Sequence, residues 1–194
     1  MRRIRHFDEL NSTSVYAHQH LEELNNFEII SCDLQTSGHG QFEGVWFSSN
    51  KNGGNVYISI ILKPENIEHL NELTRYVALI GAKTIKEYGL NPQFKYPNDI
   101  LINGKKIAGF LAESEFLGQV CKGVIVGCGI NLNLDNEELK NIDIPATSIY
   151  KETGKQVDKQ EFLDKFLSNF ENEYNDFLIN GIKGEVLCLI LKYG

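Results

Sequence analysis

The sequence predicts an α+β fold in which a mixed, largely antiparallel sheet is backed by helices. Two apolar runs flank the dipeptide Asn103-Gly104, which is the strongest local signal for a β-hairpin. Two longer segments, which follow Pro64 and Asp158, repeat their apolar residues at helical spacing. Consecutive strands joined by tight turns, together with amphipathic helices, favour an antiparallel or mixed sheet with helices packed on it.

Length and composition indicate a single globular unit. The 194 residues are 42% hydrophobic and 23% charged, close to ordinary globular usage. Nineteen basic and 26 acidic side chains give a net charge of -7, the wrong sign for a surface that follows a nucleic-acid backbone. No apolar run approaches the roughly 20 residues of a membrane helix. We therefore expect a soluble protein that binds neither nucleic acid nor a membrane.

The N-terminus and the cysteines favour a cytoplasmic location. The first nine residues include basic side chains but no apolar segment of the kind that a secretory signal needs. Cys32, Cys121, Cys128 and Cys188 show no Cys-x-x-Cys spacing, so we expect buried free thiols in a reducing compartment. Cys121 and Cys128 are seven residues apart, which places them on opposite faces if one strand carries both.

The first half of the chain is predicted to begin with a helix, a strand, a loop and a second strand. Hydroxyl residues at 12–14 are suited to capping a short helix over residues 15–24. A strand over 27–33 is followed by a loop over 35–46, which is too rich in glycine and polar groups for a regular element. The β-branched and apolar residues 55–62 predict a buried strand.

The rest of the chain is predicted to hold a long helix, a group of strands and a final helix. Apolar residues at helical spacing from Ile67 onward predict one amphipathic helix that ends near Gly89. Strands are predicted at 94–96, on both sides of the Asn-Gly turn, and over 123–134. The final helix, capped by Asp158, carries an aromatic residue every three or four positions, which is typical of core packing.

No standard metal, nucleophile or nucleotide motif is present. His18 and His20 are two residues apart and would face different directions on a helix, so they cannot hold one ion together. The sequence contains no Gly-x-Ser-x-Gly elbow, no Walker-type loop and no Gly-x-Gly-x-x-Gly after a strand. Candidate chemistry has to come from other segments.

Two segments carry polar groups that packing alone does not require. In Gly38-His39-Gly40, two glycines would let backbone N–H groups approach an anion, although a plain turn explains the same residues. Residues 95–109 bring a carboxylate, an amide and up to three ammonium groups together. We expect the Lys105 ammonium to be solvated. The Lys106 ammonium should instead be held in one direction, because Lys106 begins an apolar run that anchors the aliphatic part of its side chain.

At these residues the sequence resembles the biotin protein ligases, the enzymes that attach biotin to carboxylase carrier domains. The family's Lys-Trp-Pro-Asn-Asp motif is followed by a hairpin and by Gly-x-Lys-x-Ala-Gly, and its other signals occur here in the same order. The matching segments are Ser12-Thr13-Ser14, Gln35 with Gly38, Gly40 and Trp46, Lys95-Tyr96-Pro97-Asn98-Asp99, Gly104-Lys105-Lys106-Ile107-Ala108-Gly109, Gly127-Cys128-Gly129-Ile130-Asn131 and Ala146-Thr147-Ser148.

The resemblance implies a fold, a reaction and a set of ligands. The fold would be the biotin/lipoate ligase catalytic domain, which is like that of class II aminoacyl-tRNA synthetases, over residues 1–180. Biotin would react with Mg-ATP to give biotinyl-5'-AMP, and a lysine of a biotin carboxyl carrier domain would then take the biotinyl group. ATP, Mg²⁺ and biotin enter as substrates, and no tightly bound cofactor is expected.

The resemblance also implies roles for individual residues. Lys106 would contact the biotin carboxylate and the α-phosphate, and Asp99 would orient the acceptor lysine or Mg²⁺. The biotin-binding residues would be Ser12, Thr13, Ser14, Gln35, Gly38, His39, Gly40, Gln41, Lys106 and Gly109. The residues around ATP or the adenylate would be His39, Gln41, Trp46, Lys95, Asn98, Lys106 and Asn131.

The chain departs from the family pattern at the glycine loop and at its two ends. The family's Gly-Arg-Gly-Arg is Gly38-His39-Gly40-Gln41 here, so charge stabilisation of the adenylate should be weaker. The usual small β-barrel would be reduced to a short strand or remnant over residues 181–194. No helix-turn-helix precedes the domain, which excludes a repressor role, and a homodimer is left open.

Two other functions fit parts of the same pattern. A non-catalytic protein that binds biotin or biotinyl-AMP would keep the pocket without the chemistry. A lipoate or octanoate ligase would share the fold. Retention of Lys106, Asp99 and the nucleotide-side residues favours an enzyme, and Gln35 with the hydroxyls of residues 12–13 favours biotin, because a plain acyl chain has no ureido group to bind.

Overall fold

The computed structural model describes residues 3–40, 44–49 and 53–182. In chain order the elements are β1 (Arg3–Leu10), α1 (Thr13–Gln19), β2 (Glu28–Gln35), β3 (Gly38–His39), β4 (Val45–Trp46), β5 (Asn55–Leu62), the 3-10 turn η1 (Leu70–Glu72), α2 (Leu73–Lys86), β6 (Gln93–Lys95), β7 (Asp99–Ile102), β8 (Lys105–Leu117), β9 (Val120–Asn131), α3 (Asn136–Leu139), α4 (Ile149–Thr153) and α5 (Lys159–Asn180).

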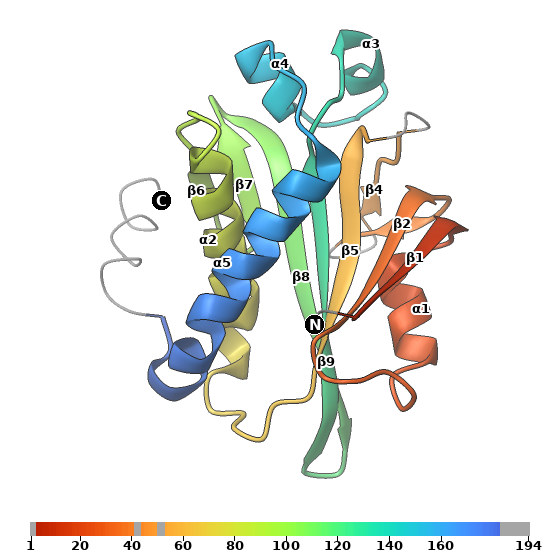
Figure 1. The fold of residues 1–194 in the computed structure, drawn as a ribbon, viewed down its shortest axis with the longest axis vertical. Helices are drawn as coiled ribbons and strands as arrows, with labels where there is room; N and C mark the ends of the chain where they lie inside the picture. Colours follow the sequence, from red (N-terminus) through yellow and green to blue (C-terminus); the bar gives the residue numbers. More distant parts are fainter. Residues whose placement is uncertain (1–2, 41–43, 50–52, 183–194) are drawn as a thin grey trace.

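One seven-stranded sheet organises the molecule, in the order β1-β2-β5-β9-β8-β7-β6 (Figure 1). Only β1 and β2 pair in parallel, and every other pair in this sheet is antiparallel. This confirms the predicted mixed, largely antiparallel sheet. The short strands β3 and β4 pair with each other outside it, within the segment that we predicted to be a loop.

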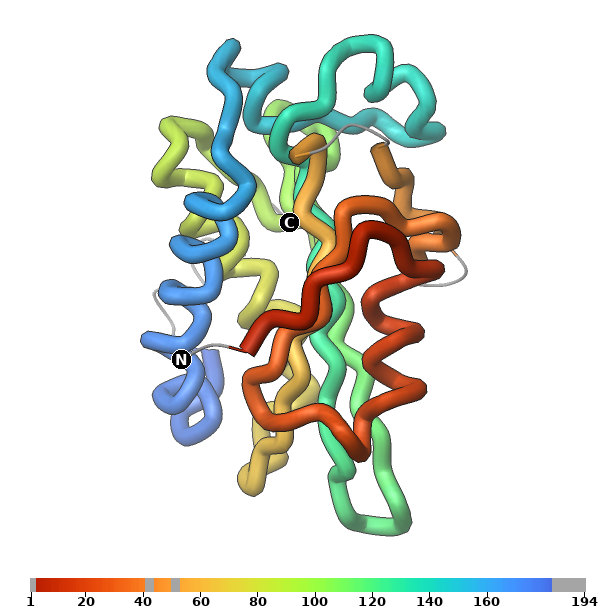
Figure 2. The backbone as a smooth tube through the Cα atoms, turned by 45° about the vertical axis from the view of Figure 1, so that its right-hand side comes forward, coloured from red at the N-terminus to blue at the C-terminus, as the bar shows by residue number. Residues whose placement is uncertain are grey.

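Helices cover both faces of the sheet, as Figure 2 shows with α1 on one side and α5 on the other. The larger core lies under α2 and α5 and takes alternate strand residues such as Ile58 and Ile60. The smaller core lies under α1 and includes Ile61 and Ile125. Because β5 and β9 are covered on both faces, their sequences read as nearly continuous apolar runs. Among the described helices none is long and apolar enough to cross a membrane.

The helix boundaries follow local capping. The Ser12 hydroxyl accepts a hydrogen bond from the Val15 N–H, so α1 begins at Thr13, and it ends at Gln19 rather than at the predicted residue 24. The Asp158 carboxylate caps α5 by accepting from the Glu161 N–H at 2.7 Å, as predicted. The aromatic stripe of α5 is buried, which confirms its role in the core.

The hairpin is as predicted, but several other elements differ from prediction. The predicted hairpin is present, with Asn103 and Gly104 both at positive φ as a tight Asn-Gly turn requires. Strand β1 was not predicted, and the helix predicted from Ile67 begins only at Leu73, after the 3-10 turn. The two short helices α3 and α4 were also missed.

The described cysteines are free thiols, but one prediction about them is wrong. Strand β9 carries both Cys121 and Cys128, and both pack against the larger core rather than on opposite faces. The pairing of β9 with β8 skips Lys122, because Glu115 pairs with Gly123 and the next residue pairs with Cys121. This extra residue reverses the alternation. Cys188 lies outside the described residues.

Candidate active site

Two adjoining pockets are lined by residues of the sheet and of the segments around α1 and β4. The first is lined by Ser12, Thr13, Ser14, Gln35, His39, Gly40, Trp46, Ile58, Asn98, Lys106, Gly109, Phe110, Leu111, Glu113, Gly127, Cys128 and Gly129. The second is lined by Gly40, Gly44, Val45, Trp46, Phe47, Asn98, Asp99, Lys106, Asn131, Asn141, Ile142, Asp143, Ile144 and Ala146. Four residues belong to both: Gly40, Trp46, Asn98 and Lys106.

A polar network forms one wall of the first pocket. The Gln35 Oε1 atom accepts hydrogen bonds from the Thr13 N–H at 2.8 Å and from the Thr13 hydroxyl at 3.3 Å. The Ser59 hydroxyl donates to the Thr13 Oγ1 atom at 2.9 Å and lies 3.0 Å from the Ser14 hydroxyl. Within the described residues Gln35 Nε2 makes no hydrogen bond, so its two protons remain for a ligand. The network therefore holds donors and acceptors in place before a ligand arrives.

Three glycines make room for the Trp46 indole between the pockets. Gly109 of β8 and Gly129 of β9 are paired across the sheet. A Cβ atom would lie 2.9 Å from the indole at Gly109 and 2.5 Å from it at Gly129, so a side chain at either position would displace the ring. At Gly38 a Cβ atom would lie 2.8 Å from the Trp46 carbonyl oxygen. The Trp46 Nε1–H group is buried and has no hydrogen-bond acceptor among the described residues.

The two pockets meet at an ion pair. The Lys106 ammonium lies 2.7 Å from Asp99 Oδ1, and only 20% and 16% of the two side chains are exposed. The ammonium also lies 5.1 Å from the centre of the Trp46 ring. Within the part of the chain that is described, the buried Asp99 Oδ1 atom has this ion pair but no directed hydrogen bond. The Lys106 ammonium is thus a partly desolvated cation, held in position by Asp99, at the place where the two pockets meet.

The backbone of Lys106 is held from a second segment of the chain. Its N–H donates to the Pro145 carbonyl at 2.8 Å, and its carbonyl accepts from the Thr147 N–H at 2.9 Å. Ala146 therefore forms a parallel bridge with Lys106. Residues 145–147, about 40 residues further along the chain, therefore fix the position of the Lys106 backbone.

Three predicted nucleotide-side residues differ in how close they come to the pockets. Asn98 lines both pockets, while its Nδ2 donates to the Phe110 carbonyl at 2.9 Å. Asn131 lines the second pocket, but its amide is engaged by Asn55 and by the Thr147 carbonyl, which indicates a structural role. Lys95 is exposed on β6 and lines neither pocket.

The glycine loop is only partly as predicted. His39 lines the first pocket, and its side chain is exposed. The Gly40 N–H donates to the Gly44 carbonyl at 2.7 Å, so it is not available for an anion, and this favours the plain turn over the backbone nest at Gly40. Gln41 lies outside the described residues.

Sequence reasoning missed several residues of the site. Ser59 lines neither pocket but donates to the Thr13 hydroxyl of the pocket wall, and its hydroxyl within the largely apolar, fully buried strand β5 was an available signal. Asp143 lines the second pocket together with Asp99, and two carboxylates beside a nucleotide-sized pocket could hold a hard divalent cation. Cys128 also borders the first pocket, but its side chain packs in the larger core, where burial raises the pKa of its thiol and keeps it neutral.

The chain is similar in sequence to a family of acyl-transferring ligases. Residues 6–131 match the model of the Biotin/lipoate A/B protein ligase family. The bifunctional ligase/repressor BirA of Bacillus subtilis is 36% identical over 182 residues, covering 90% of this chain and 54% of the relative. The biotin--[acetyl-CoA-carboxylase] ligase of Paracoccus denitrificans is 32% identical over 136 residues, covering 67% of this chain and 55% of the relative. The chain thus spans about half the length of these curated relatives.

Solved structures show the same likeness in three dimensions. The biotin protein ligase of Aquifex aeolicus in complex with biotin and ATP superimposes with a TM-score of 0.79 and 28% identity. The superposition covers 98% of this chain and 79% of that one. The biotin protein ligase of Leishmania major in complex with biotin has a TM-score of 0.74 at 20% identity, which supports the fold alone.

Proposed function

The chain belongs to the biotin/lipoate A/B protein ligase family, and on that premise we propose that it is an ATP-dependent biotin protein ligase. It would activate biotin to biotinyl-5'-AMP and transfer the biotinyl group to a lysine of a biotin carboxyl carrier domain. The observation that carries this proposal is the position of the Lys106 ammonium, which lines both pockets. A cation at that junction can contact an acid in one pocket and a nucleotide in the other.

In the first step a biotin carboxylate oxygen attacks the α-phosphorus of ATP. The new O–P bond forms as the bond from the α-phosphorus to the bridging oxygen breaks, and pyrophosphate leaves. Two anions must approach each other, so the reaction needs positive charge that is fixed before they meet. Lys106 supplies that charge, and its ion pair with Asp99 and its backbone bonds to residues 145–147 hold it in place.

In the second step the amine of the acceptor lysine attacks the acyl carbon of the adenylate. The C–N bond forms as the bond from that carbon to the phosphate oxygen breaks, AMP leaves, and the nitrogen gives up a proton to solvent. The Asp99 carboxylate borders the second pocket beside Lys106, where it can orient the incoming amine. The Trp46 indole covers the glycine floor and can keep water from the mixed anhydride. Its buried Nε1–H group, which lacks an acceptor in the described structure, can donate to the bound adenylate.

The residues present also fit Mg²⁺. This ion is usually held in nucleotide sites by one or two carboxylates together with substrate phosphates. Asp99 and Asp143 both line the second pocket, and the Asp99 ion pair with Lys106 uses Oδ1. When bound, Mg²⁺ would lower the negative charge of the triphosphate.

The polar wall of the first pocket favours biotin over lipoate or octanoate. The ureido ring of biotin offers one carbonyl acceptor and two N–H donors, and a plain acyl chain offers none. Thr13 and Gln35 line this pocket, and the hydrogen bonds from Thr13 to Gln35 Oε1 leave the Gln35 Nε2 protons for the ligand, which an acyl chain would leave unpaired. The free thiols among the described cysteines support the cytoplasmic location that we propose.

The test is exchange of labelled pyrophosphate into ATP, run with biotin, lipoate or octanoate as the acid, beside calorimetric titration of biotin. We expect exchange with biotin alone, followed by a mass increase of one biotinyl group when a carrier domain is added. Exchange with lipoate or octanoate alone would make the protein an acyl ligase of the same fold. Biotin binding without exchange would make it a binding protein.

A further inference from the structure

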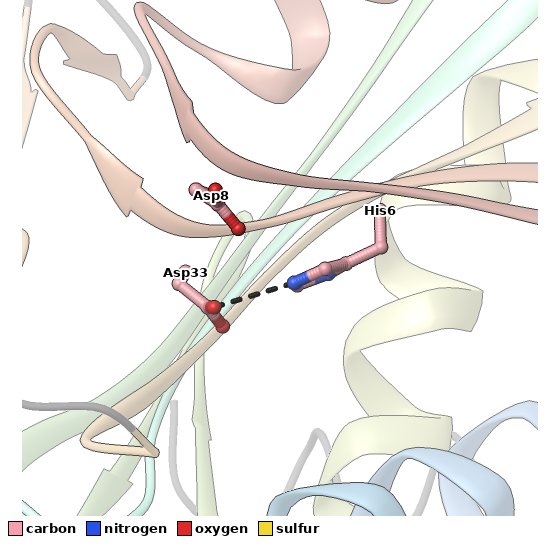
Figure 3. Close-up of side chains that lie close together, drawn as sticks. All are labelled: His6, Asp8 and Asp33. Atoms are coloured by element: carbon pink, nitrogen blue, oxygen red, sulfur yellow. Dashed lines mark hydrogen bonds and ion pairs between the residues drawn. The ribbon is translucent and has the colours of Figure 1, made fainter.

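We infer that His6, Asp8 and Asp33 form a site for a divalent transition-metal ion at the β1–β2 edge of the sheet (Figure 3). None of the three residues lines either pocket of the candidate active site. The inference therefore does not depend on the proposed ligase activity.

Strand pairing brings the three side chains to one face. His6 and Asp8 are two residues apart on β1, so both point to the same side of the sheet. The parallel register pairs Phe7 with Cys32 and Glu9 with Leu34, which places Asp33 of β2 opposite Asp8. Phe7 packs into the core under α1, so the three side chains face the opposite side. The three side chains meet there because β1 and β2 are neighbouring strands.

The ligand atoms lie close to the spacing of a metal site. One atom from each residue lies within 4.8 Å of the others. The His6 Nε2 atom is 3.3 Å from Asp33 Oδ2, and Figure 3 shows the ring and the carboxylate facing each other. In a tetrahedral zinc site with bonds of about 2.0–2.2 Å, two ligand atoms are about 3.4 Å apart. Only Asp8 has to move inward, and its side chain is exposed.

The outer atoms of two ligands are held by other groups. The His6 Nδ1 atom lies 3.4 Å from the Ser31 hydroxyl, which leaves Nε2 directed at Asp33. The Lys159 ammonium binds Asp33 Oδ1 at 2.8 Å, which leaves Oδ2 directed at His6. Partners of this kind orient the ligands in known metal sites.

The charges around the site favour a dication. Burial opposes ionisation of Asp33, but the hydrogen bond and charge of Lys159, with a smaller effect of His6, lower the pKa of the carboxyl overall. Asp33 is therefore ionised at neutral pH. The site holds two carboxyl groups, from Asp8 and Asp33, and the one ammonium in contact with them belongs to Lys159.

The donor set selects the kind of ion. One imidazole nitrogen with two carboxylate oxygens suits Zn²⁺ or a similar first-row ion, whereas Mg²⁺ prefers oxygen ligands alone. Three protein ligands leave a fourth position for water. Because β1 pairs only with β2, an ion shared by the two strands would fasten the edge strand to the sheet.

The test is calorimetric titration of Zn²⁺, with Mg²⁺ as the comparison ion, into the full chain after removal of any affinity tag and treatment with a chelator. We expect one Zn²⁺ per chain and a rise in Tm with Zn²⁺. His6→Gln and Asp8→Asn should each weaken binding at least tenfold and abolish the rise in Tm. Asp8 is exposed, so the second substitution leaves the fold intact.

Two matched variants serve as controls. Glu9→Gln removes a carboxylate from the opposite face of β1, and His20→Gln removes an imidazole that hydrogen-bonds within α1. Both should bind Zn²⁺ as the natural chain does. The inference is overturned if the natural chain shows no saturable Zn²⁺ binding, or if His6→Gln and Asp8→Asn bind as tightly as the controls. Pyrophosphate exchange is expected to be the same in all four variants.

Discussion

At the scale of single residues, the site combines a motif that is visible in the sequence with partners that only the fold supplies. Lys106 and Asp99 were predicted from the Lys-Tyr-Pro-Asn-Asp and Gly-Lys-Lys-Ile-Ala-Gly segments, and they lie 2.7 Å apart. The part played by Pro145 and Thr147 in holding the lysine backbone could not be predicted, because no local pattern links them to residue 106.

The glycine loop leads to a prediction about the intermediate. By the resemblance to the family, His39 and Gln41 stand where it has arginines, so fewer permanent charges would face a bound adenylate. On the proposed function, we expect biotinyl-AMP to escape and to label lysines on a bystander protein. His39→Arg should lower this stray labelling about ten- to a hundredfold, since a charge-assisted contact contributes about 1.5–3 kcal/mol. The measurement is a streptavidin blot of a bystander protein incubated with enzyme, biotin and ATP.

The control for this experiment adds the same charge elsewhere. His20→Arg places a guanidinium on α1 outside the residues that line the pockets. It should leave stray labelling unchanged. If the natural chain labels only its carrier domain, or if both arginine variants behave alike, the explanation based on the loop is wrong.

Ser59 and Lys95 show where residue-scale reasoning reached its limits. Ser59 was passed over because strand residues 55–62 were read as a core element, and the hydroxyl is invisible to an apolar pattern. Lys95 was included because it belongs to the family motif, yet β6 directs it to solvent. A motif identifies residues that lie near one another in sequence, but it does not say which of them face the pocket.

At the scale of elements, α2 comes closest to the Phe110 ring of β8 at a glycine, Gly81. A Cβ atom at Gly81 would lie 2.3 Å from the ring of Phe110, a fully buried side chain. Gly81→Ala should therefore lower the free energy of unfolding by about 1–3 kcal/mol, as overpacked cores do. Urea unfolding monitored by circular dichroism measures the change.

A second substitution makes this packing prediction specific. Phe110→Leu removes the ring that the new methyl group would strike. In Gly81→Ala/Phe110→Leu the loss should be smaller than the sum of the two single losses. Additive losses, or a neutral Gly81→Ala, would show that the ring and the helix are not in the contact described.

The edge strand β1 depends on a buried carboxylate. The Glu28 side chain is fully buried, and it accepts hydrogen bonds from Arg5 at 2.5 Å and from the Asn25 N–H at 2.9 Å. Burial raises the pKa of Glu28, but the hydrogen bonds from Asn25 and Arg5 outweigh this and hold it below its ordinary value of 4.5. A lowered pKa in the folded state stabilises the fold above that value, and this stabilisation is lost as the pH falls through the folded pKa.

This sign gives a prediction for Glu28→Gln. At pH 7 the variant should lose about 1.5–3 kcal/mol of unfolding free energy, since a hydrogen-bonded charge is removed. The difference from the natural chain should narrow as the pH falls from about 4.5 through the lowered pKa of the folded state, where the natural carboxyl becomes protonated. Urea unfolding across this pH range measures it. Glu23→Gln, which removes an exposed carboxylate in the preceding turn, should show no such difference, and a gap that is constant with pH would contradict the assignment.

The elements differ in how well their sequences predict them. The Asn103-Gly104 hairpin, β5 and α5 were predicted because turn chemistry, an apolar run and helical periodicity each point to one structure. Strand β1 was missed because residues 3–10 are rich in charged side chains and histidine. An edge strand buries little of its surface, so it needs no apolar pattern. The possible metal ligands His6 and Asp8 were missed with it.

At the scale of the whole molecule, the strand order creates the site. The pockets draw residues from α1, β2, β4, β8 and β9, which become neighbours only in the order β1-β2-β5-β9-β8-β7-β6. No local pattern predicts this order, and the parallel pairing of β1 with β2 was not expected from consecutive tight turns. The site could be predicted only from the family motifs, because a match to the family implies the whole domain and its strand order. The predicted boundary at residue 181 stays a prediction.

The central claim is that one ammonium group joins the two pockets during adenylation, and Lys106→Met tests it most directly. The matched control is Lys105→Met, because Lys105 precedes it on β8 but lines neither pocket. In biotin-dependent pyrophosphate exchange at saturating substrates, we expect Lys106→Met to fall by about 10²–10³-fold and Lys105→Met to match the natural chain. Equal exchange rates in the two variants would contradict the account.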